Sequence, residues 1–295
     1  MNVEVSPEPG ATGRGGEHCS DARGGARIGV LVPFTNVNLE PDLALLCPPT
    51  CTLHVARLGG YAAERTPGAE QMAGLGASDM GEALRLIAGV RPHAVLYGCT
   101  SATLVHGPGF DRELGARIRA LCDAPALTAA GALLVALEAL GARRVGFCSP
   151  YLGEINERAV RFLAEAGVGV VRRTDIGREL GNYAQGELAP EEVYELGLRA
   201  DHPEAEAIVL SCTDMRAVET IERLESALGK PVVTSNQALV FALLGQLDLP
   251  HRADLPGRLF ECRAASAPTL TPSERSIDRE SQPSGRPLSA RGERR

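Results

Sequence analysis

The chain has 295 residues, a formal net charge of −7, 44% hydrophobic residues and 4% aromatic residues, with no Trp. This length predicts about two domains, and an acidic chain poor in aromatic residues lacks the composition of a nucleic-acid-binding protein. The sequence contains no run of about 18 apolar residues, the length that a membrane-spanning helix needs. We therefore expect neither nucleic acid nor a membrane as a partner.

Both ends of the chain have the composition of disordered segments. Residues 1–26 are rich in Gly and polar residues and lack the apolar region of an export signal, while residues 263–295 are rich in Ser, Pro and Arg. We expect a disordered leader and a disordered tail around a folded part. Without an export signal we also expect a cytoplasmic protein, whose eight cysteines are reduced thiols.

Between these ends, short apolar runs alternate with longer stretches of helical pattern. The predicted strands cover residues 28–32, 52–58, 94–97, 126–128, 144–148, 169–173, 207–210 and 232–234. The predicted helices cover residues 79–88, 112–121, 130–140, 151–166, 190–200, 215–228 and 237–244. Such alternation is typical of βαβ units and parallel sheets, so the sequence predicts an α/β fold.

The second half of the folded part repeats the first. The segment IGVLVP, from residue 28, matches VGFCSP, from residue 145, and PALTAAGALLVAL, from residue 125, matches PVVTSNQALVFAL, from residue 231. A repeat of this length indicates two copies of one α/β unit rather than a solenoid. We expect two similar domains related by a pseudo-twofold axis, each with a parallel β-sheet flanked by helices, and a site between them. The expected first domain is 27–127 plus 236–262, and the second is 128–235.

A cysteine follows a strand at the same place in each copy. HAVLYGCTSATL contains Cys99, EAIVLSCTDMRA contains Cys212, and Thr follows both. In parallel α/β sheets, ligands bind beyond the carboxyl ends of the strands, and a helix N-terminus there favours anions and thiolates. Because helical pattern follows both cysteines, we expect each at a helix N-terminus, with the two thiols facing one another across a single site.

Polar residues follow other strands at the same predicted edge. Asn36 follows the first strand, Tyr151 follows its repeat partner, and Ser235 and Asn236 follow the last. Each could be a helix cap or a turn residue, or a hydrogen-bond donor in a shared cleft. Their convergence favours the second interpretation for Asn36 and Tyr151.

No cofactor or metal is expected from the motifs. Cys47 and Cys51 lie in CPPTC, which lacks further ligands at zinc spacing. The glycine pair Gly74 and Gly76 does not follow a strand, so it is a poor dinucleotide fingerprint, and the chain has no phosphate-binding loop.

The segments VPFTNVNLEPD, YGCTSATLVHG, SPYLGEINERA and LSCTDMRAVETIERLESALGKPVVTSNQAL resemble the aspartate/glutamate racemase superfamily. Within it they are most similar to the branch of maleate cis–trans isomerases and arylmalonate decarboxylases, over about residues 27–247. The resemblance implies two similar α/β domains, a site between them, and no cofactor or metal. The isomerases of this branch have one cysteine in each domain, whereas the decarboxylase keeps only the second and has glycine at the first.

The matching motifs also imply roles for residues of this chain. Cys99 and Cys212 correspond to the catalytic pair, Asn36 to a ligand of the substrate carboxylate, and Tyr151 to a hydrogen-bond donor. Asn182 is similar to an asparagine of the isomerases, in a loop whose spacing departs from the family pattern.

A cradle of backbone N–H groups for a carboxylate or an enediolate is implied at four further residues, Thr100, Ser101, Thr213 and Asp214. Asp214 also places an acid beside the second thiol, where it could orient the loop or raise the pKa of the thiol. A thiolate can act as a base opposite a thiol acid. It can also add to a cis double bond, after which rotation and elimination give the trans acid.

Two cysteines favour a cofactor-independent isomerase of a small dicarboxylate, with conversion of maleate to fumarate as the specific expectation. An amino-acid racemase of the aspartate or glutamate type is an alternative. An arylmalonate-type decarboxylase with Cys212 as proton donor is another, against which Cys99 in place of glycine counts. A non-catalytic carboxylate-binding protein is the third. The expected partner is a small carboxylate, and a homo-oligomer is left open.

Overall fold

The computed structural model describes residues 25–59, 68–77, 80–151 and 153–262. The predicted tail, and the predicted leader up to residue 24, lie outside the described residues. Within the described part, no helix has both the length and the apolar character that crossing a membrane requires.

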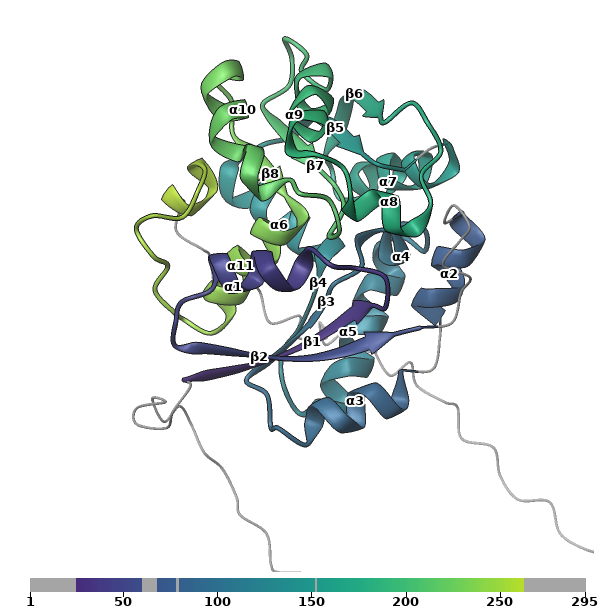
Figure 1. The fold of residues 1–295 in the computed structure, drawn as a ribbon, viewed down its shortest axis with the longest axis vertical. Coiled ribbons are helices and arrows are strands. Elements are labelled where there is room, and N and C mark those ends of the chain that lie inside the picture. Colours follow the sequence, from purple (N-terminus) through teal and green to yellow (C-terminus); the bar gives the residue numbers. More distant parts are fainter. Residues whose placement is uncertain (1–24, 60–67, 78–79, 152, 263–295) are drawn as a thin grey trace, which may run out of the picture.

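The described strands form two four-stranded parallel sheets with the same topology (Figure 1). The strand order is β2-β1-β3-β4 in one sheet and β6-β5-β7-β8 in the other. The bounds are β1 Ala26–Pro33, β2 Cys51–Leu58, β3 Ala94–Tyr97, β4 Ala126–Thr128, β5 Arg144–Ser149, β6 Gly169–Asp175, β7 Ala207–Leu210 and β8 Val232–Thr234. All predicted strands are found, and the α/β fold built from two similar parallel-sheet units is confirmed.

The central strands are buried because helices pack over parallel sheets. β3 reads AVLY and β7 reads AIVL, and every residue of both is buried. β1 pairs with β3 from Ile28↔Ala94, and β5 pairs with β7 from Val145↔Ala207. This register brings the carboxyl ends of the two central strands of each sheet side by side, and the segments that follow them form the site.

Helices and short 3-10 turns connect the strands (Figure 1). In the first half they are α1 Leu39–Leu46, α2 Ala69–Ala77, α3 Gly81–Ala88, α4 Thr100–Leu104, α5 Pro108–Cys122 and α6 Ala129–Leu140. In the second half they are α7 Gly153–Glu165, α8 Asn182–Gly186, α9 Pro190–Arg199, η1 Val218–Thr220, α10 Ile221–Leu228, α11 Ser235–Gln246 and η2 Arg258–Glu261. The helices that were not predicted, α1, α2 and α8, have nine residues or fewer, which is too short for a clear helical period. α4 is the helix expected after Cys99.

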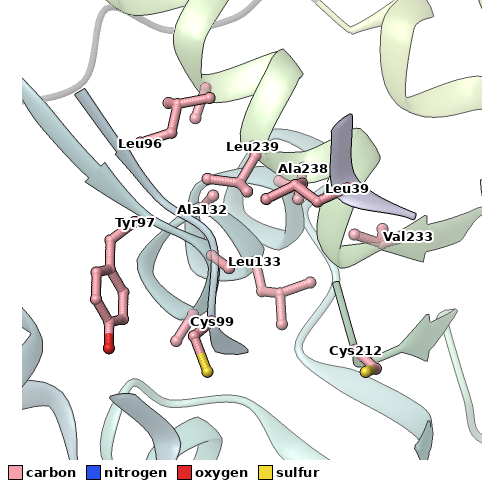
Figure 2. Packing of buried hydrophobic residues seen from close by; sticks show 14 of the residues in the cluster. Leu39, Leu96, Tyr97, Cys99, Ala132, Leu133, Cys212, Val233, Ala238 and Leu239 are labelled. Atoms are coloured by element: carbon pink, nitrogen blue, oxygen red, sulfur yellow. The ribbon is translucent and has the colours of Figure 1, made fainter. Parts of the chain in front are cut away.

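Two apolar helices join the halves of the molecule. α6 follows β4 and α11 follows β8; the helices pack against each other, and each contacts both strands. Figure 2 shows Leu133 of α6 and Leu239 of α11 in this shared core. Thr128 and Thr234 cap the two helices, each accepting a backbone N–H with its hydroxyl oxygen. Each of these helices contacts strands of both sheets, so their packing does not assign them to one half. The domain boundaries at 127/128 and 235/236 stay predictions.

The helix predicted over residues 215–228 is wrong at its start, because regular α-helix begins only at Ile221. Tertiary hydrogen bonds hold the preceding turn in a different conformation. The Thr213 hydroxyl donates to the Gly98 carbonyl at 2.9 Å, and the Asn236 amide donates to the Thr213 carbonyl at 3.0 Å. The second cysteine therefore precedes a turn, and the expectation of a helix N-terminus at that position is also wrong.

Gly146 in β5 tests this packing. A Cβ added there would lie 2.1 Å from the Ala200 carbonyl oxygen, and a backbone atom cannot rotate away. We expect Gly146→Ala to lower the free energy of unfolding by roughly 2–3 kcal/mol, measured by chemical denaturation. The control is Gly109→Ala in α5, where an added Cβ would have no neighbour within 4 Å. Equal stability of the two variants would contradict the close approach of β5 and the end of α9.

Candidate functional site

A small pocket lies at the carboxyl ends of the strands and takes its walls from both copies of the repeat. It is lined by Pro33, Thr35, Asn36, Met72, Cys99, Ser101, Tyr151, Asn182, Gln185, Cys212, Thr213 and Asp214. Eight of the nine residues that the sequence analysis placed in a site are among them. Two larger surface grooves, one along α5 and β4 and one beside η2, contain neither cysteine of the repeat.

Cys99 comes from the first copy, directly after β3, and is the N-cap residue of α4. Its neighbour Gly98 is required by close packing, since an added Cβ would lie 2.1 Å from a methyl group of Leu39. The Cys99 Sγ accepts the backbone N–H groups of Ser101 and Ala102. Both bonds favour a thiolate, but burial outweighs them and raises the pKa of Cys99 above its usual value.

Cys212 comes from the second copy, after β7. Its thiol lies 3.8 Å from the Gln185 Oε1, to which it donates, and its Sγ accepts the Asp214 backbone N–H at 3.4 Å. Burial and then the Asp214 charge raise the pKa of Cys212 to about 12. Desolvation and the neighbouring acid therefore oppose a thiolate at Cys212, where the sequence predicted that a helix N-terminus would favour one. Figure 2 shows both cysteines at the margin of the shared core.

Tyr151 connects the surroundings of the two thiols. Its hydroxyl is hydrogen-bonded to Cys212 and to Ser101, and burial raises the pKa of Tyr151 well above its usual value. The phenol is therefore a neutral donor at physiological pH. Its position is fixed from behind, because Ser149 accepts its backbone N–H at 3.1 Å and Asn156 donates to its carbonyl at 2.6 Å.

Asn36 lies where both interpretations place it, at the pocket and in a turn. Its Nδ2 donates to the Thr213 hydroxyl at 3.0 Å, which ties the loop after β1 to the turn after β7. Its Oδ1 accepts the backbone N–H groups of Asn38 and Leu39 at 3.2 and 3.0 Å, at the start of α1. The side chain thus lines the pocket and also stabilises a turn.

Asp214 both orients the loop and raises the pKa of the adjacent thiol. Its Oδ1 accepts the backbone N–H groups of Val37 and Asn38 at 2.8 and 3.2 Å. The Asn38 amide donates to the Asp214 carbonyl at 2.7 Å. Burial outweighs these hydrogen bonds and the nearby charge of Arg57, and raises the pKa of Asp214 to about 7.

Three of the candidate polar residues lie behind the pocket instead of lining it. The Thr100 hydroxyl donates to the Ser235 Oγ at 3.0 Å. The Asn236 amide donates to Asp42 at 2.7 Å as well as to the Thr213 carbonyl. These contacts hold the two cysteine loops in place from the side of the core.

Sequence reasoning missed Gln185 and Met72. Gln185 lies in α8, in the same GNYAQG segment as Asn182, so the resemblance of that segment was a usable signal. Met72 lies in α2, and the Ser101 hydroxyl donates to its sulfur at 3.1 Å. No motif marks it. It reaches the pocket only because α2 packs on α4.

Among the residues described, no group of three or more His, Cys, Asp or Glu side chains could hold a metal ion. The thiols of Cys47 and Cys51 are hydrogen-bonded to each other, away from the pocket. The pocket offers a substrate two thiols, a phenol, hydroxyl and amide groups, and one carboxyl.

Comparisons with known proteins agree with this architecture. A family model described as arylmalonate decarboxylase matches residues 71–260. The maleate isomerase of Nocardia farcinica is 29% identical over 246 residues, which cover 79% of this chain and 95% of that protein. A cysteine-to-serine variant of the Nocardia farcinica maleate cis-trans isomerase, solved with a covalently bound succinylcysteine intermediate, has a TM-score of 0.73 at 27% identity over 80% of this chain and 98% of that chain. A cysteine-to-alanine variant of the maleate isomerase Iso from Pseudomonas putida S16, solved with maleate, has a TM-score of 0.72 at 25% identity over 80% of this chain and 98% of that chain.

The raised pKa values of Cys99 and Cys212 predict that these two thiols react more slowly with an alkylating reagent than Cys51 does. Only thiolates are alkylated, and a hydrogen bond from Cys47 lowers the pKa of half-buried Cys51. Iodoacetamide at neutral pH, followed by peptide mass spectrometry, should modify Cys51 well before Cys99 and Cys212. In urea this order should disappear. Early modification of Cys212 in the folded protein would contradict the buried, protonated state.

Proposed function

The chain belongs to the arylmalonate decarboxylase family, and from that premise we propose that it is a cofactor-independent cis–trans isomerase that converts maleate to fumarate. The observation that carries the proposal is the pair of thiols, one from each copy of the repeat, in one small pocket. The maleate isomerases that the chain matches along almost their whole length support the same reaction.

The surroundings of the two thiols differ, and this difference supports a role for each. The Cys99 Sγ accepts two backbone N–H groups, which stabilise a thiolate. Cys212 stands beside Asp214, whose charge opposes a thiolate, and is hydrogen-bonded to Tyr151. We assign Cys99 as the nucleophile and Cys212 as the proton donor.

The reaction then follows from the chemistry of an unsaturated diacid. The Cys99 thiol first gives its proton to solvent. The resulting thiolate adds to one carbon of the double bond, and the charge moves onto the far carboxylate as an enediolate. Cys212 gives its proton to the adjacent carbon, which leaves a succinyl group on the Cys99 sulfur. The central bond is now single and rotates. Return of that proton to Cys212 and departure of the Cys99 thiolate give fumarate.

The other lining residues support binding and charge stabilisation. Asn36 and the Tyr151 hydroxyl are neutral donors aimed at a carboxylate or at the enediolate. Thr213, Ser101, Thr100 and Asn182 complete the proposed binding residues, with Thr100 acting from behind the pocket.

The seven described cysteines are free thiols, which supports a cytoplasmic location. A homo-oligomer stays a prediction.

Replacing either thiol tests the reaction. Cys99→Ser and Cys212→Ser should each lower the rate of maleate isomerisation by roughly 1,000-fold or more, because they remove a group that acts only in the reaction. Proton NMR of maleate and fumarate measures the rate. Cys212→Ser should also accumulate an adduct with the added mass of one maleic acid on Cys99, visible by mass spectrometry, because solvent can protonate the enediolate while no thiolate remains to remove that proton again. The control Cys262→Ser, outside the pocket, should keep wild-type activity. Full activity in either of the first two variants would overturn the paired-thiol mechanism.

The same assay in deuterated water separates the alternatives. Phenylmalonate is included because the matching family model is described as arylmalonate decarboxylase. We expect it to be left intact. Loss of its carboxylate would identify a decarboxylase. Deuterium incorporation at the α carbon of aspartate or glutamate would identify a racemase. Binding of maleate without any turnover would identify a carboxylate-binding protein.

Asn36→Asp separates the two roles of that residue. Aspartate keeps an oxygen that accepts the Asn38 and Leu39 N–H groups, but it replaces a donor to the substrate with a negative charge. We expect kcat/KM for maleate to fall roughly 10- to 100-fold, the value of a hydrogen bond to a charged group, and thermal stability to fall as well, because the bond to the Thr213 hydroxyl is lost. Lower stability with unchanged kinetics would show that Asn36 is a turn residue only.

A further inference from the structure

The described residues that line the pocket provide no positive charge to receive a dicarboxylate. Of the described residues that line it, none is a cation, and Asp214 is its one acid. Arg57 acts on Asp214 through its charge, but its guanidinium donates to the Asn36 carbonyl at 2.7 Å and is paired with Glu40. An ionised Asp214 would therefore place a negative charge next to a substrate that carries two.

The two carboxyl oxygens of Asp214 have different surroundings. Oδ1 receives the backbone N–H groups of Val37 and Asn38, and the Asn38 amide lies 3.4 Å from it. A proton on this carboxyl therefore belongs on Oδ2, because Oδ1 already accepts its donors. Gly186 packs closely against the Asp214 carboxyl. A Cβ added to Gly186 would lie 3.0 Å from both carboxyl oxygens.

The groups that share the pocket with Asp214 do not neutralise it. The pKa values of Cys99, Cys212 and Tyr151 are all raised by burial, so these groups are uncharged at neutral pH. α8, from Asn182 to Gly186, reads NYAQG and contributes no charge.

The charged groups on the remaining sides largely offset one another. Arg57 of β2 is paired with Glu40 in the first turn of α1. Asp42, also in that turn, bonds to Asn236 behind the Cys212 loop, and burial raises its pKa to about 6. Asp214, with a pKa of about 7, is balanced between its two states, so the approach of an anion moves it to the neutral one.

We propose that Asp214 binds the substrate in its protonated form and donates a hydrogen bond from Oδ2 to a substrate carboxylate, so that a dicarboxylate enters the site together with one proton from solvent. The inference rests on the proposed function, which supplies the dicarboxylate. The protonation of Asp214 would also couple substrate binding to the reactivity of the two thiols. The charge of Asp214 is among the causes that raise the pKa of both thiols, and its neutralisation removes that opposition when substrate is present.

Proton uptake is measured directly by titration calorimetry. Cys99→Ser protein is titrated with maleate at a pH about one unit above the pKa of Asp214, where both carboxyls of free maleate are ionised, in buffers of different ionisation enthalpy. This variant cannot form the adduct, and it removes one thiol proton from the balance. We expect uptake of about one proton per maleate bound. Above the pKa, Kd should rise about tenfold per pH unit.

Two further variants on the same background identify the group. Addition of Asp214→Asn keeps the acceptor for Val37 and Asn38 and should abolish both the proton uptake and the pH dependence of Kd. Addition of Asp42→Asn removes the other buried acid and should leave about one proton taken up. The KM of the wild-type enzyme for maleate should rise over the same pH range, a measurement that needs no variant.

The outcomes separate this inference from the proposed function. Turnover of maleate by the wild type, with no proton uptake on binding or with uptake retained after Asp214→Asn, overturns the role of Asp214 and leaves the isomerase standing. Absence of both turnover in the wild type and binding in Cys99→Ser overturns the isomerase, and the role of Asp214 with it.

Discussion

One buried hydroxyl joins the three loops on which the site depends. The Thr213 Oγ1 donates to the Gly98 carbonyl at 2.9 Å and accepts the Asn36 amide at 3.0 Å. These bonds connect the turn after β7 with the end of β3 and the loop after β1. Since β7 belongs to one copy of the repeat and the other two strands belong to its partner, the relative position of the two thiols is determined by contacts between the copies. A buried hydroxyl without partners would be costly, so the same bonds also stabilise the closed arrangement of the halves.

Two opposing effects act on the pKa of each of the two pocket thiols: hydrogen bonds to the sulfur lower it and burial raises it. Burial is the larger effect. Each sulfur accepts at least one backbone N–H, an arrangement that favours an anion, yet the pKa values of both thiols are raised. Neutral donors from Tyr151 and Asn36 face the same small volume. Such a pocket is poor at holding a charge of its own and well suited to stabilising one that a substrate brings or that develops during a reaction.

The sequence predicts the fold well because the fold depends on local and periodic features. Buried strands such as AVLY and AIVL, and a duplicated Cys-Thr at the strand ends, are visible without any long-range information. What could not be predicted depends on contacts between distant segments. The turn before α10 replaces a helix because Gly98 and Asn236 bind Thr213, and Met72 reaches the pocket through helix packing alone. The pKa of each thiol, which a helix N-terminus lowers and burial raises, depends on the same tertiary contacts.

Duplication would give two equivalent thiols, and this chain departs from equivalence beside each cysteine. The residue two after the cysteine is Ser101 in the first copy and Asp214 in the second. Ser101 places a neutral hydroxyl 3.7 Å from the sulfur of Cys99, whereas Asp214 places an acid beside Cys212. A racemase that removes a proton from either face of its substrate needs two interchangeable acid–base groups. An isomerase that works through a covalent adduct needs one nucleophile and one proton donor. The asymmetry beside the two cysteines therefore favours the isomerase over the racemase, on the same scaffold and with the same pair of cysteines.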